Sequence, residues 1–120
     1  MGLGVMASLE MTTEEIAAEA IKVVLRGRFD TTGAILIEMP FNALTNEKRA
    51  IVVDLSSVNF LSSYGIRVLL VGAKTVKGKG GKLVICCPEG NVAKVLQAAG
   101  TDTLIPVHST QEAAIAALSP

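Results

Sequence analysis

The sequence is poor in aromatic residues and has no net charge. Its 120 residues include no Trp, one Tyr and three Phe, and eleven basic residues balance eleven acidic ones. Proteins that bind single-stranded nucleic acid usually stack bases on aromatic side chains, and proteins that bind duplexes or anionic membranes usually carry a basic excess. Both absences therefore argue against nucleic acid as a partner.

Signals for membrane insertion or export are also lacking. No apolar run approaches the roughly 20 residues that span a bilayer. The first ten residues, MGLGVMASLE, lack the positive start and the longer apolar stretch of a secretory signal. A myristoylation signal would need Ser or Thr where Met6 stands. We therefore expect a cytoplasmic protein that does not insert directly into a membrane.

Histidine and cysteine are scarce as well. His108 is the only imidazole, and the only two thiols, Cys86 and Cys87, are neighbours in the sequence. Neighbouring residues on a strand point to opposite faces of a sheet, so we interpret both cysteines as small apolar residues in a reducing compartment. One imidazole and two such thiols do not supply the usual tetrahedral metal set. Since no paired acid and base is evident either, the sequence predicts no metal, no cofactor and no enzyme activity.

What the sequence does have is enough apolar residues for a core. Half of the residues are hydrophobic, which suits one compact domain over residues 1–120. Apolar and β-branched runs predict strands at 20–29, 50–58, 82–87 and 103–108. Helical patterns predict helices at 34–48, 89–100 and 109–118, and a further helix that starts within a residue or two of Ser63 and has an apolar stripe over 66–76. This alternation is typical of an α/β fold with a largely parallel sheet, and Pro106 places the last strand at an edge.

Two segments allow more than one interpretation. Residues 7–12 could form a short edge strand, and residues 13–20 could form a helical turn, since Thr12 and Glu15 have the spacing of a capping box. Within the predicted helix at 34–48, Pro40 removes a backbone donor and clashes with the preceding turn. We expect either a kink there or a second short helix with Pro40 in its first turn.

The helix predicted after residues 50–58 has a well-defined apolar face. Its apolar residues recur at helical spacing and are expected to be buried: Ile66, Leu69, Leu70, Ala73 and Val76. The basic residues of the same segment fall on the opposite side: Arg67, Lys74 and Lys77.

The junction before this helix is richer in polar groups than a plain connection requires. It consists of Ser62, Ser63, Tyr64 and Gly65, and it contains the only tyrosine. One serine suffices as the N-cap, which typically stabilises a helix by about 1 kcal/mol. The second would remain exposed at the carboxyl end of a central strand, where open α/β sheets usually bind ligands. The residues alone leave two hypotheses open, ordinary turn chemistry or a docking or phosphorylation switch, because a helix start tolerates a phosphate.

The stretch VVDLSSVNFLSSYGIRVLL resembles the signature of the STAS domain. In that family an apolar strand ends in Asp-Leu, a linker with Phe follows, and Asp-Ser-Ser/Thr-Gly-Leu opens a helix. LRGRFDTTGA resembles the family's second strand and the loop after it, and the segment from Gly80 to Leu118 resembles its closing strand–helix–strand–helix. The resemblance implies the STAS fold, a mostly parallel sheet of about five strands flanked by about four amphipathic helices.

The resemblance also implies a function. Bacterial anti-sigma factor antagonists of this family are not enzymes. They are phosphorylated on one serine by a partner that is both anti-sigma factor and serine kinase, of the histidine-kinase-like ATPase class, and a PP2C-type phosphatase removes the phosphate. The phosphorylated serine falls on Ser63, and the loop aspartate that helps to engage the kinase falls on Asp30. The partner-binding residues implied are Asp30, Ser62, Ser63, Tyr64, Gly65 and Arg67.

Two positions depart from the family pattern. Ser62 stands where the family has aspartate, which removes a negative charge and adds a competing acceptor for phosphate, and Tyr64 stands where the family has Ser, Thr or Ala. Two other functions stay open. The chain could be a STAS subunit of a membrane transport complex without a phosphorylation switch, or it could bind a small ligand or nucleotide at a pocket between Asp30 and Ser63.

Overall fold

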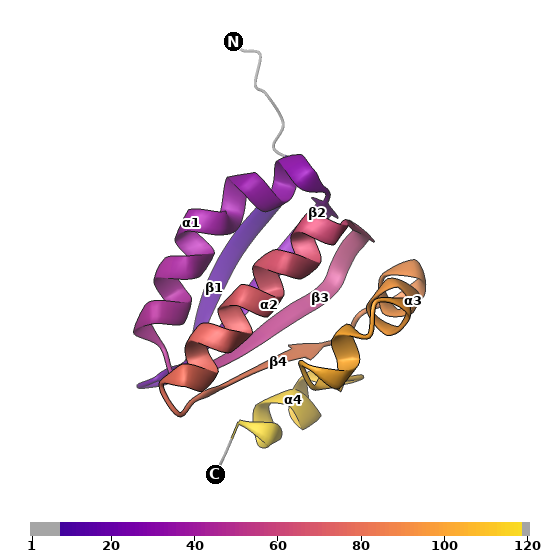
Figure 1. Ribbon diagram of the computed structural model, residues 1–120. Helices are drawn as coiled ribbons and strands as arrows, with labels where there is room; N and C mark the ends of the chain where they lie inside the picture. Colours follow the sequence, from indigo (N-terminus) through magenta and orange to yellow (C-terminus); the bar gives the residue numbers. More distant parts are fainter. Residues whose placement is uncertain (1–7, 119–120) are drawn as a thin grey trace.

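Five strands and four helices build the protein, as seen in a computed structural model that describes residues 8–118 (Figure 1). Of the first ten residues, from which no secretory or myristoylation signal was predicted, residues 1–7 with Met6 lie outside the described part. The sheet has the strand order β1-β2-β3-β4-β5. β1 runs antiparallel to β2, and the other neighbouring strands are parallel. The predicted α/β fold with a mostly parallel, five-stranded sheet is confirmed.

The N-terminal hairpin corrects one prediction. β1 (Leu9–Ala17) pairs along almost its whole length with β2 (Ala20–Phe29), so the helical turn expected at residues 13–20 is wrong. Cross-strand partners outweigh the local helical pattern, because Glu14 on β1 lies 3.6 Å from the ammonium of Lys22 on β2. β2 itself begins and ends where the sequence predicted.

The central strands form the most buried part of the sheet. β3 (Ala50–Leu61) continues three residues beyond the predicted Val58, and β4 (Lys82–Cys86) pairs with it in parallel register. β5 (Val107–His108) lies at the sheet edge, as predicted, but it begins after Pro106 and not at the predicted Thr103, which belongs to a 3₁₀ turn.

The end of β4 corrects a second prediction. The strand ends at Cys86, and Cys87 follows in the left-handed backbone region with φ of 63°. The alternation of a regular strand therefore does not continue, and Cys87 packs with Cys86 against the same apolar cluster. The expectation that the two thiols point to opposite faces is wrong.

Helix α1 (Thr31–Glu47) is one helix that contains Pro40, so a second short helix does not form. The carbonyl that loses its donor to Pro40 belongs to Leu36, one turn earlier. Both residues are exposed, so water can bind that carbonyl at little cost. The tolerance of α1 for proline follows from this exposure.

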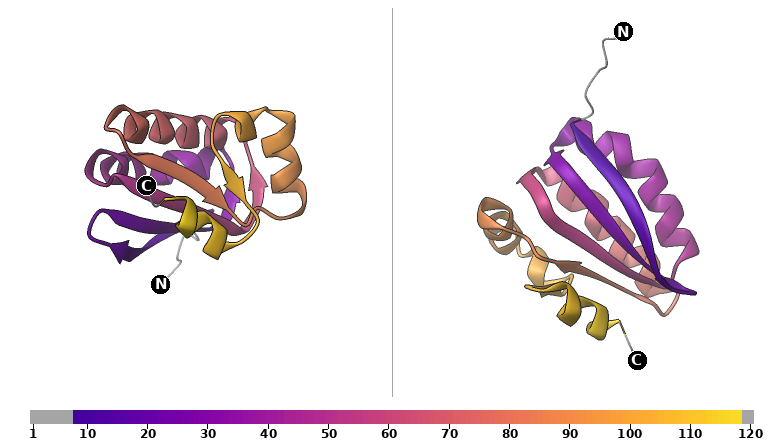
Figure 2. Two further views of the ribbon diagram at one scale, coloured as in Figure 1. Left: turned by 90° about the horizontal axis from the view of Figure 1, so that it is seen from below. Right: turned by 180° about the vertical axis from the view of Figure 1, so that it is seen from behind.

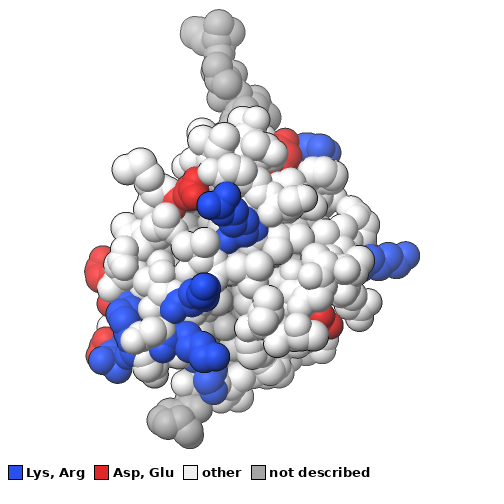
Figure 3. Space-filling view, viewed as in Figure 1, with Lys and Arg blue, Asp and Glu red and all other residues white. Residues whose placement is uncertain are grey.

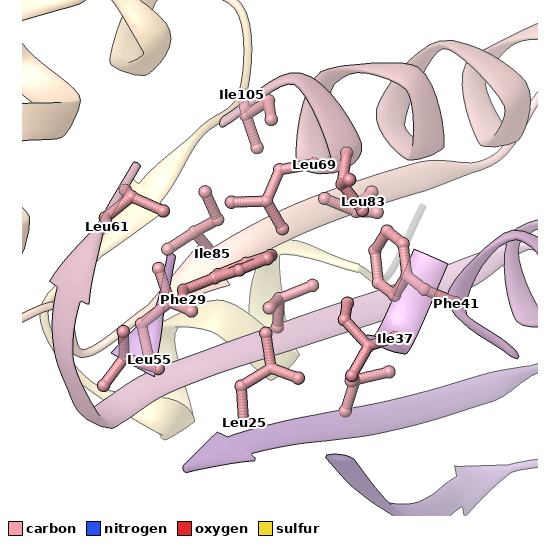
Figure 4. Packing of buried hydrophobic residues seen from close by; sticks show 14 of the residues in the cluster. Leu25, Phe29, Ile37, Phe41, Leu55, Leu61, Leu69, Leu83, Ile85 and Ile105 are labelled. Carbon is pink, nitrogen blue, oxygen red and sulfur yellow. The ribbon is translucent and has the colours of Figure 1, made fainter. Parts of the chain in front are cut away.

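Helix α2 (Ser63–Gly78) lies beside α1 on the same face of the sheet (Figures 1 and 2). A Cβ at Gly72 would lie 2.6 Å from the ring of Phe41, so glycine permits this close approach of the two helices. Figure 4 shows Phe29, Phe41 and Leu69 pointing into one shared cluster between helices and sheet.

The apolar face of α2 is rotated slightly from the predicted one. Its buried residues are Gly65, Val68, Leu69, Gly72 and Val76, whereas Ile66, Leu70 and Ala73 are only partly buried. The two glycines did not count as apolar residues in the predicted pattern, yet both face the core: Gly72 lies against Phe41 of α1, and Gly65 lies against the ends of β2 and β3. The basic side of the helix is exposed as expected.

The C-terminal elements complete both faces of the sheet. Helix α3 (Gly90–Ala98) and a 3₁₀ turn at Thr101–Thr103 join the α1–α2 side, where Val92, Leu96 and Ile105 enter the main core. Helix α4 (Gln111–Ala117) covers part of the opposite face, as the left view of Figure 2 shows. There Ala114 is fully buried, whereas the predicted Ile115 and Leu118 are partly buried. Across residues 8–118, no helix combines the length and apolarity needed to cross a bilayer.

Candidate functional site

The candidate site lies where two neighbouring parallel strands each pass into a helix. β2 ends at Phe29 and α1 begins at Thr31, while β3 ends at Leu61 and α2 begins at Ser63. The backbone amide of Ser62 donates a hydrogen bond of 2.9 Å to the carbonyl oxygen of Phe29. This bond joins the two junctions, so the N-termini of α1 and α2 lie next to each other at the carboxyl ends of their strands.

The two serines of the junction have different structural roles. Ser62 is the N-cap of α2, and its Oγ accepts a hydrogen bond of 3.1 Å from the amide of Gly65. Ser63 is the first residue of the helix and is exposed. The sequence predicted that one serine would cap the helix and the other would remain available, and this division is what the structure has.

Asp30 occupies the equivalent position on α1. It is the N-cap of that helix, and its Oδ1 accepts a hydrogen bond of 2.8 Å from the amide of Gly33. The Ser8 hydroxyl lies 3.3 Å from the same oxygen, and Nε of Arg28 lies 3.5 Å from Oδ2. The amide of Gly33, followed by Ser8 and Arg28, lowers the pKa of this carboxyl below its ordinary value, and partial desolvation opposes them. Asp30 is therefore a charged group at the helix start, adjacent to the junction of Ser62.

Arg28 is a contributor that the sequence did not single out. Its guanidinium pairs with Asp30 and also lies over the ring of Phe60, 4.4 Å from the ring centre. Arg28 comes from β2 and Phe60 from β3, so the stacked pair bridges the same two strands. The sequence shows a basic residue after Gly27, but only the pairing of β2 with β3 shows which aromatic ring Arg28 contacts.

Tyr64 links the start of α2 to the middle of α1. Its hydroxyl donates a hydrogen bond of 2.7 Å to Oε1 of Glu38. The Glu38 carboxylate accepts this hydrogen bond only from the neutral phenol, and its negative charge disfavours the phenolate. The bond to Glu38 therefore raises the pKa of Tyr64, with a smaller opposing effect from Arg67. Glu38 was missed by sequence reasoning, since a glutamate on the polar side of a helix gives no signal of a partner 26 residues away.

Gly65 is required by packing. A Cβ at this position would lie 2.9 Å from Cδ1 of Phe29 and 3.0 Å from Cδ1 of Leu61. The first turn of α2 can therefore lie against the ends of β2 and β3 only if this residue has no side chain. Glycine fixes the depth of the helix start, and thereby the position of Ser63.

Arg67 lies exposed on α2, one helical turn after Ser63. Figure 3 shows the other Lys and Arg side chains of this face gathered mainly towards its lower part. Exposed apolar side chains contribute to the uncharged area on α1, where Ile35, Leu36 and Met39 are 58%, 50% and 82% exposed. The helix starts thus border an apolar surface that sequence periodicity did not reveal.

Potential metal ligands gather elsewhere in the molecule. Within residues 8–118 one group of side chains is close enough to share a metal ion, and it consists of Asp54, Cys86 and Cys87. Cys86 belongs to the apolar cluster under α4, and Cys87 packs against that cluster. The expectation of no metal-ligand cluster considered only sequence spacing, and it missed this grouping because Asp54 comes from another strand.

Comparison with known proteins gives a consistent family. A family model for the STAS domain matches residues 8–114. A candidate anti-sigma factor antagonist, BtrV of Bordetella bronchiseptica, is 31% identical over 110 residues, which cover 91% of this chain and 94% of that protein.

Solved structures share the fold. An anti-sigma factor antagonist from Mycobacterium paratuberculosis has a TM-score of 0.84 at 24% identity, with 97% of this chain and 98% of that chain covered. The phosphorylated form of the Bacillus cell fate determinant SpoIIAA has a TM-score of 0.71 at 19% identity, with 92% and 100% covered. The fold also extends to a sulfate transporter family protein from Wolinella succinogenes, with a TM-score of 0.73 at 12% identity and 88% of each chain covered.

Proposed function

This chain belongs to the STAS domain family, and on that basis we propose that it acts as an anti-sigma factor antagonist in a partner-switching pathway. In this proposal residues 1–120 act as one cytoplasmic domain without enzyme activity. Ser63 is the residue that is reversibly phosphorylated. The relative from Bordetella bronchiseptica supports the general role through its name, and the geometry of the helix start supports the residue assignment.

The observation that carries the assignment is the division of work between the two serines. The Ser62 hydroxyl is held by the amide of Gly65 and forms part of the helix start, so transferring a phosphate to it would remove the cap. Ser63 is exposed and its hydroxyl can enter the active site of a kinase without breaking a cap. Ser63 is therefore the better acceptor, even though Ser62 replaces the aspartate of the family pattern.

A phosphate on Ser63 would be tolerated by the fold. It adds about 1.5–2 negative charges at neutral pH beside the free amides of the first helical turn. Those amides and the helix dipole commonly contribute about 0.3–1 kcal/mol towards an anion at an exposed site. Arg67 follows four residues later, so its guanidinium lies on the same side of the helix and can pair with the phosphate.

The same phosphate would change recognition by a partner. Ser63 is exposed beside the junction that Ser62 forms with the end of β2, and the neighbouring Tyr64 bonds to Glu38 on α1, the helix that also carries exposed apolar side chains. A partner docked on this surface would have to desolvate the doubly charged phosphate or supply basic residues to it. We propose that the unphosphorylated protein binds an anti-sigma factor that is also a serine kinase of the histidine-kinase-like ATPase class. A PP2C-type phosphatase would restore that form.

The test is phosphopeptide mass spectrometry after incubation with the cognate kinase and ATP. We expect phosphate on Ser63 in the unmodified chain and none on the Ser63→Ala variant. A Ser63→Asp variant should fold normally and bind the kinase at least tenfold more weakly, which corresponds to about 1.4 kcal/mol. Phosphate on Ser62 or Tyr64 but not on Ser63 would refute the assignment.

The matched control is Ser62→Asp, which restores the family residue and keeps an N-cap of equal strength. It should leave Ser63 phosphorylated. If no cellular kinase modifies any serine of the chain, the switch is wrong, and a subunit of a membrane transport complex becomes the better hypothesis. The similarity to the sulfate transporter family protein supports that alternative at the level of fold only.

A further inference from the structure

Three side chains with metal-binding atoms meet on the sheet face that α4 partly covers. The carboxylate of Asp54 and the sulfur atoms of Cys86 and Cys87 all lie within 4.8 Å of one another. Asp54 on β3 and Cys86 on β4 are partners in the parallel register, so the sheet itself sets their spacing. The grouping is therefore a product of the fold and not of neighbouring positions in the sequence.

The backbone at Cys87 is what brings the second thiol to this group. Its φ of 63° is the only positive value at a non-glycine position among residues 8–118. A residue with a Cβ rarely adopts this region, and such conformations persist where the surrounding structure holds them. Here the left-handed turn places both thiols against the same cluster, whereas an extended Cys87 would have pointed to the other face.

Charge and burial at the group favour a cation. Asp54 is 4% exposed and Cys86 is fully buried, and Oδ1 of Asp54 accepts a hydrogen bond of 2.9 Å from the amide of Ser56. A buried carboxylate needs hydrogen bonds or a positive charge to offset its desolvation. Lys22 supplies a cation from β2, but its ammonium is bound to Oε1 of Gln111 at 2.8 Å and lies 3.6 Å from Glu14.

We propose that Asp54, Cys86 and Cys87 bind a divalent cation that favours sulfur, of the zinc class. Two thiolates and one carboxylate suit the tetrahedral preference of Zn²⁺, with water as the fourth ligand. Each thiol releases its proton to solvent as its sulfur binds the ion. The two charges of the ion offset two of the three negative charges of the thiolates and the carboxylate, and the amide of Ser56 stabilises the carboxylate further. Cys87 is only partly buried, which gives the ion a way in.

His108 lies next to this site. It is the register partner of Cys86 on β5, so its side chain leaves the same face of the sheet. Its Nε2 is buried and has no hydrogen-bond partner among the described residues. The water on a bound metal ion would give the buried Nε2 of His108 the hydrogen-bond partner that the protein groups do not provide.

The experiment uses the full chain, reduced and freed of metal. Cd²⁺ serves as a spectroscopic probe, because binding to thiolates produces an ultraviolet charge-transfer band, and the chain has no thiols other than these two. Competition with a chromophoric chelator then measures the affinity for Zn²⁺. We expect one ion per chain and a thiolate band that appears in proportion to bound Cd²⁺.

Two variants separate binding from folding. Cys87→Gly removes one sulfur and should fold at least as stably, because glycine adopts a positive φ without strain. Asp54→Asn keeps the oxygen that accepts from Ser56 and removes the charge. Each should lower the affinity for Zn²⁺ at least tenfold, while the control Asp102→Asn, at an exposed carboxylate, should leave it unchanged. Failure of the chain to produce a thiolate band, or Zn²⁺ affinity unchanged in both variants, would overturn the proposal.

Discussion

The hydroxyls of Ser62 and Ser63 should contribute very differently to stability, although they are neighbours. Ser62→Ala removes the oxygen that accepts from the amide of Gly65, a bond of 3.1 Å at the start of α2. Loss of an N-cap to alanine costs about 0.5–2 kcal/mol, typically about 1. Ser63→Ala removes an exposed hydroxyl inside the helix, where alanine has the better propensity, so the change should stay within about 0.5 kcal/mol.

Equilibrium unfolding in urea, followed by far-ultraviolet circular dichroism, measures both changes. For a chain of this size, 1 kcal/mol corresponds to a decrease in Tm of about 4 °C, which thermal unfolding can check. The slope of the unfolding free energy against urea should stay the same in all variants, because the surface exposed on unfolding is unchanged.

Ser62→Asp is the matched variant for this comparison. Aspartate caps a helix as well as serine does, and its negative charge is favoured at a helix N-terminus. Its stability should therefore equal or exceed that of the unmodified protein. If Ser63→Ala destabilised the protein as much as Ser62→Ala, or if Ser62→Asp were as unstable as Ser62→Ala, the capping role of Ser62 would be wrong.

Three further predictions concern the core and two titrating groups. Leu69→Ala should lower the free energy of unfolding in urea by about 2–5 kcal/mol, because it leaves a cavity in the core. Leu70→Ala should lower it by only about 1 kcal/mol, since Leu70 is partly buried. Equal losses would contradict the observed buried face of α2. Because the pKa of Asp30 is lowered, the stabilisation that its charged form provides is present above the ordinary pKa of 3.8 and is lost as the pH falls through the lowered pKa. Urea titrations at a series of acid pH values should therefore show a smaller loss of unfolding free energy for Asp30→Asn than for the unmodified chain. The pKa of Tyr64 is raised by Glu38, so the stability that the neutral phenol contributes is present below the ordinary pKa of 10.0 and is lost as the pH rises through the raised pKa. Tyr64→Phe should remove this decrease of the unfolding free energy at alkaline pH. An unchanged dependence on alkaline pH would exclude the bond.

Much of the fold could be predicted because apolar patterns in the second half are strong. The β3–α2 junction carries an apolar strand, a capping serine and a helical stripe in succession, and α2 begins at Ser63 as the pattern indicates. The start of β1 overlaps the edge strand predicted at residues 7–12, but its second half could not be predicted in the same way. Residues 13–17 have a helical local pattern and become a strand only by pairing with β2. Pairing partners distant in the sequence leave no mark on local periodicity.

The site shows the same limit. The capping role of Ser62 follows from residue type and position and is found, whereas the family resemblance places Asp30 in a loop and does not predict that it caps α1. The contacts of Tyr64 with Glu38 and of Arg28 with Phe60 depend on which helices and strands lie side by side. The left-handed backbone at Cys87 could not be predicted either, because glycine is the residue that signals a positive φ and cysteine is not.

The two edges of the sheet restrict how other molecules can associate with it. β5 has only two residues and follows a proline, so it offers almost no free backbone to a further strand. β1 is longer, but its exposed carboxylates at Glu10, Glu14 and Glu15 would repel an identical strand laid beside it. Sheet extension between copies is therefore disfavoured at both ends, which protects the protein from fibrillar aggregation.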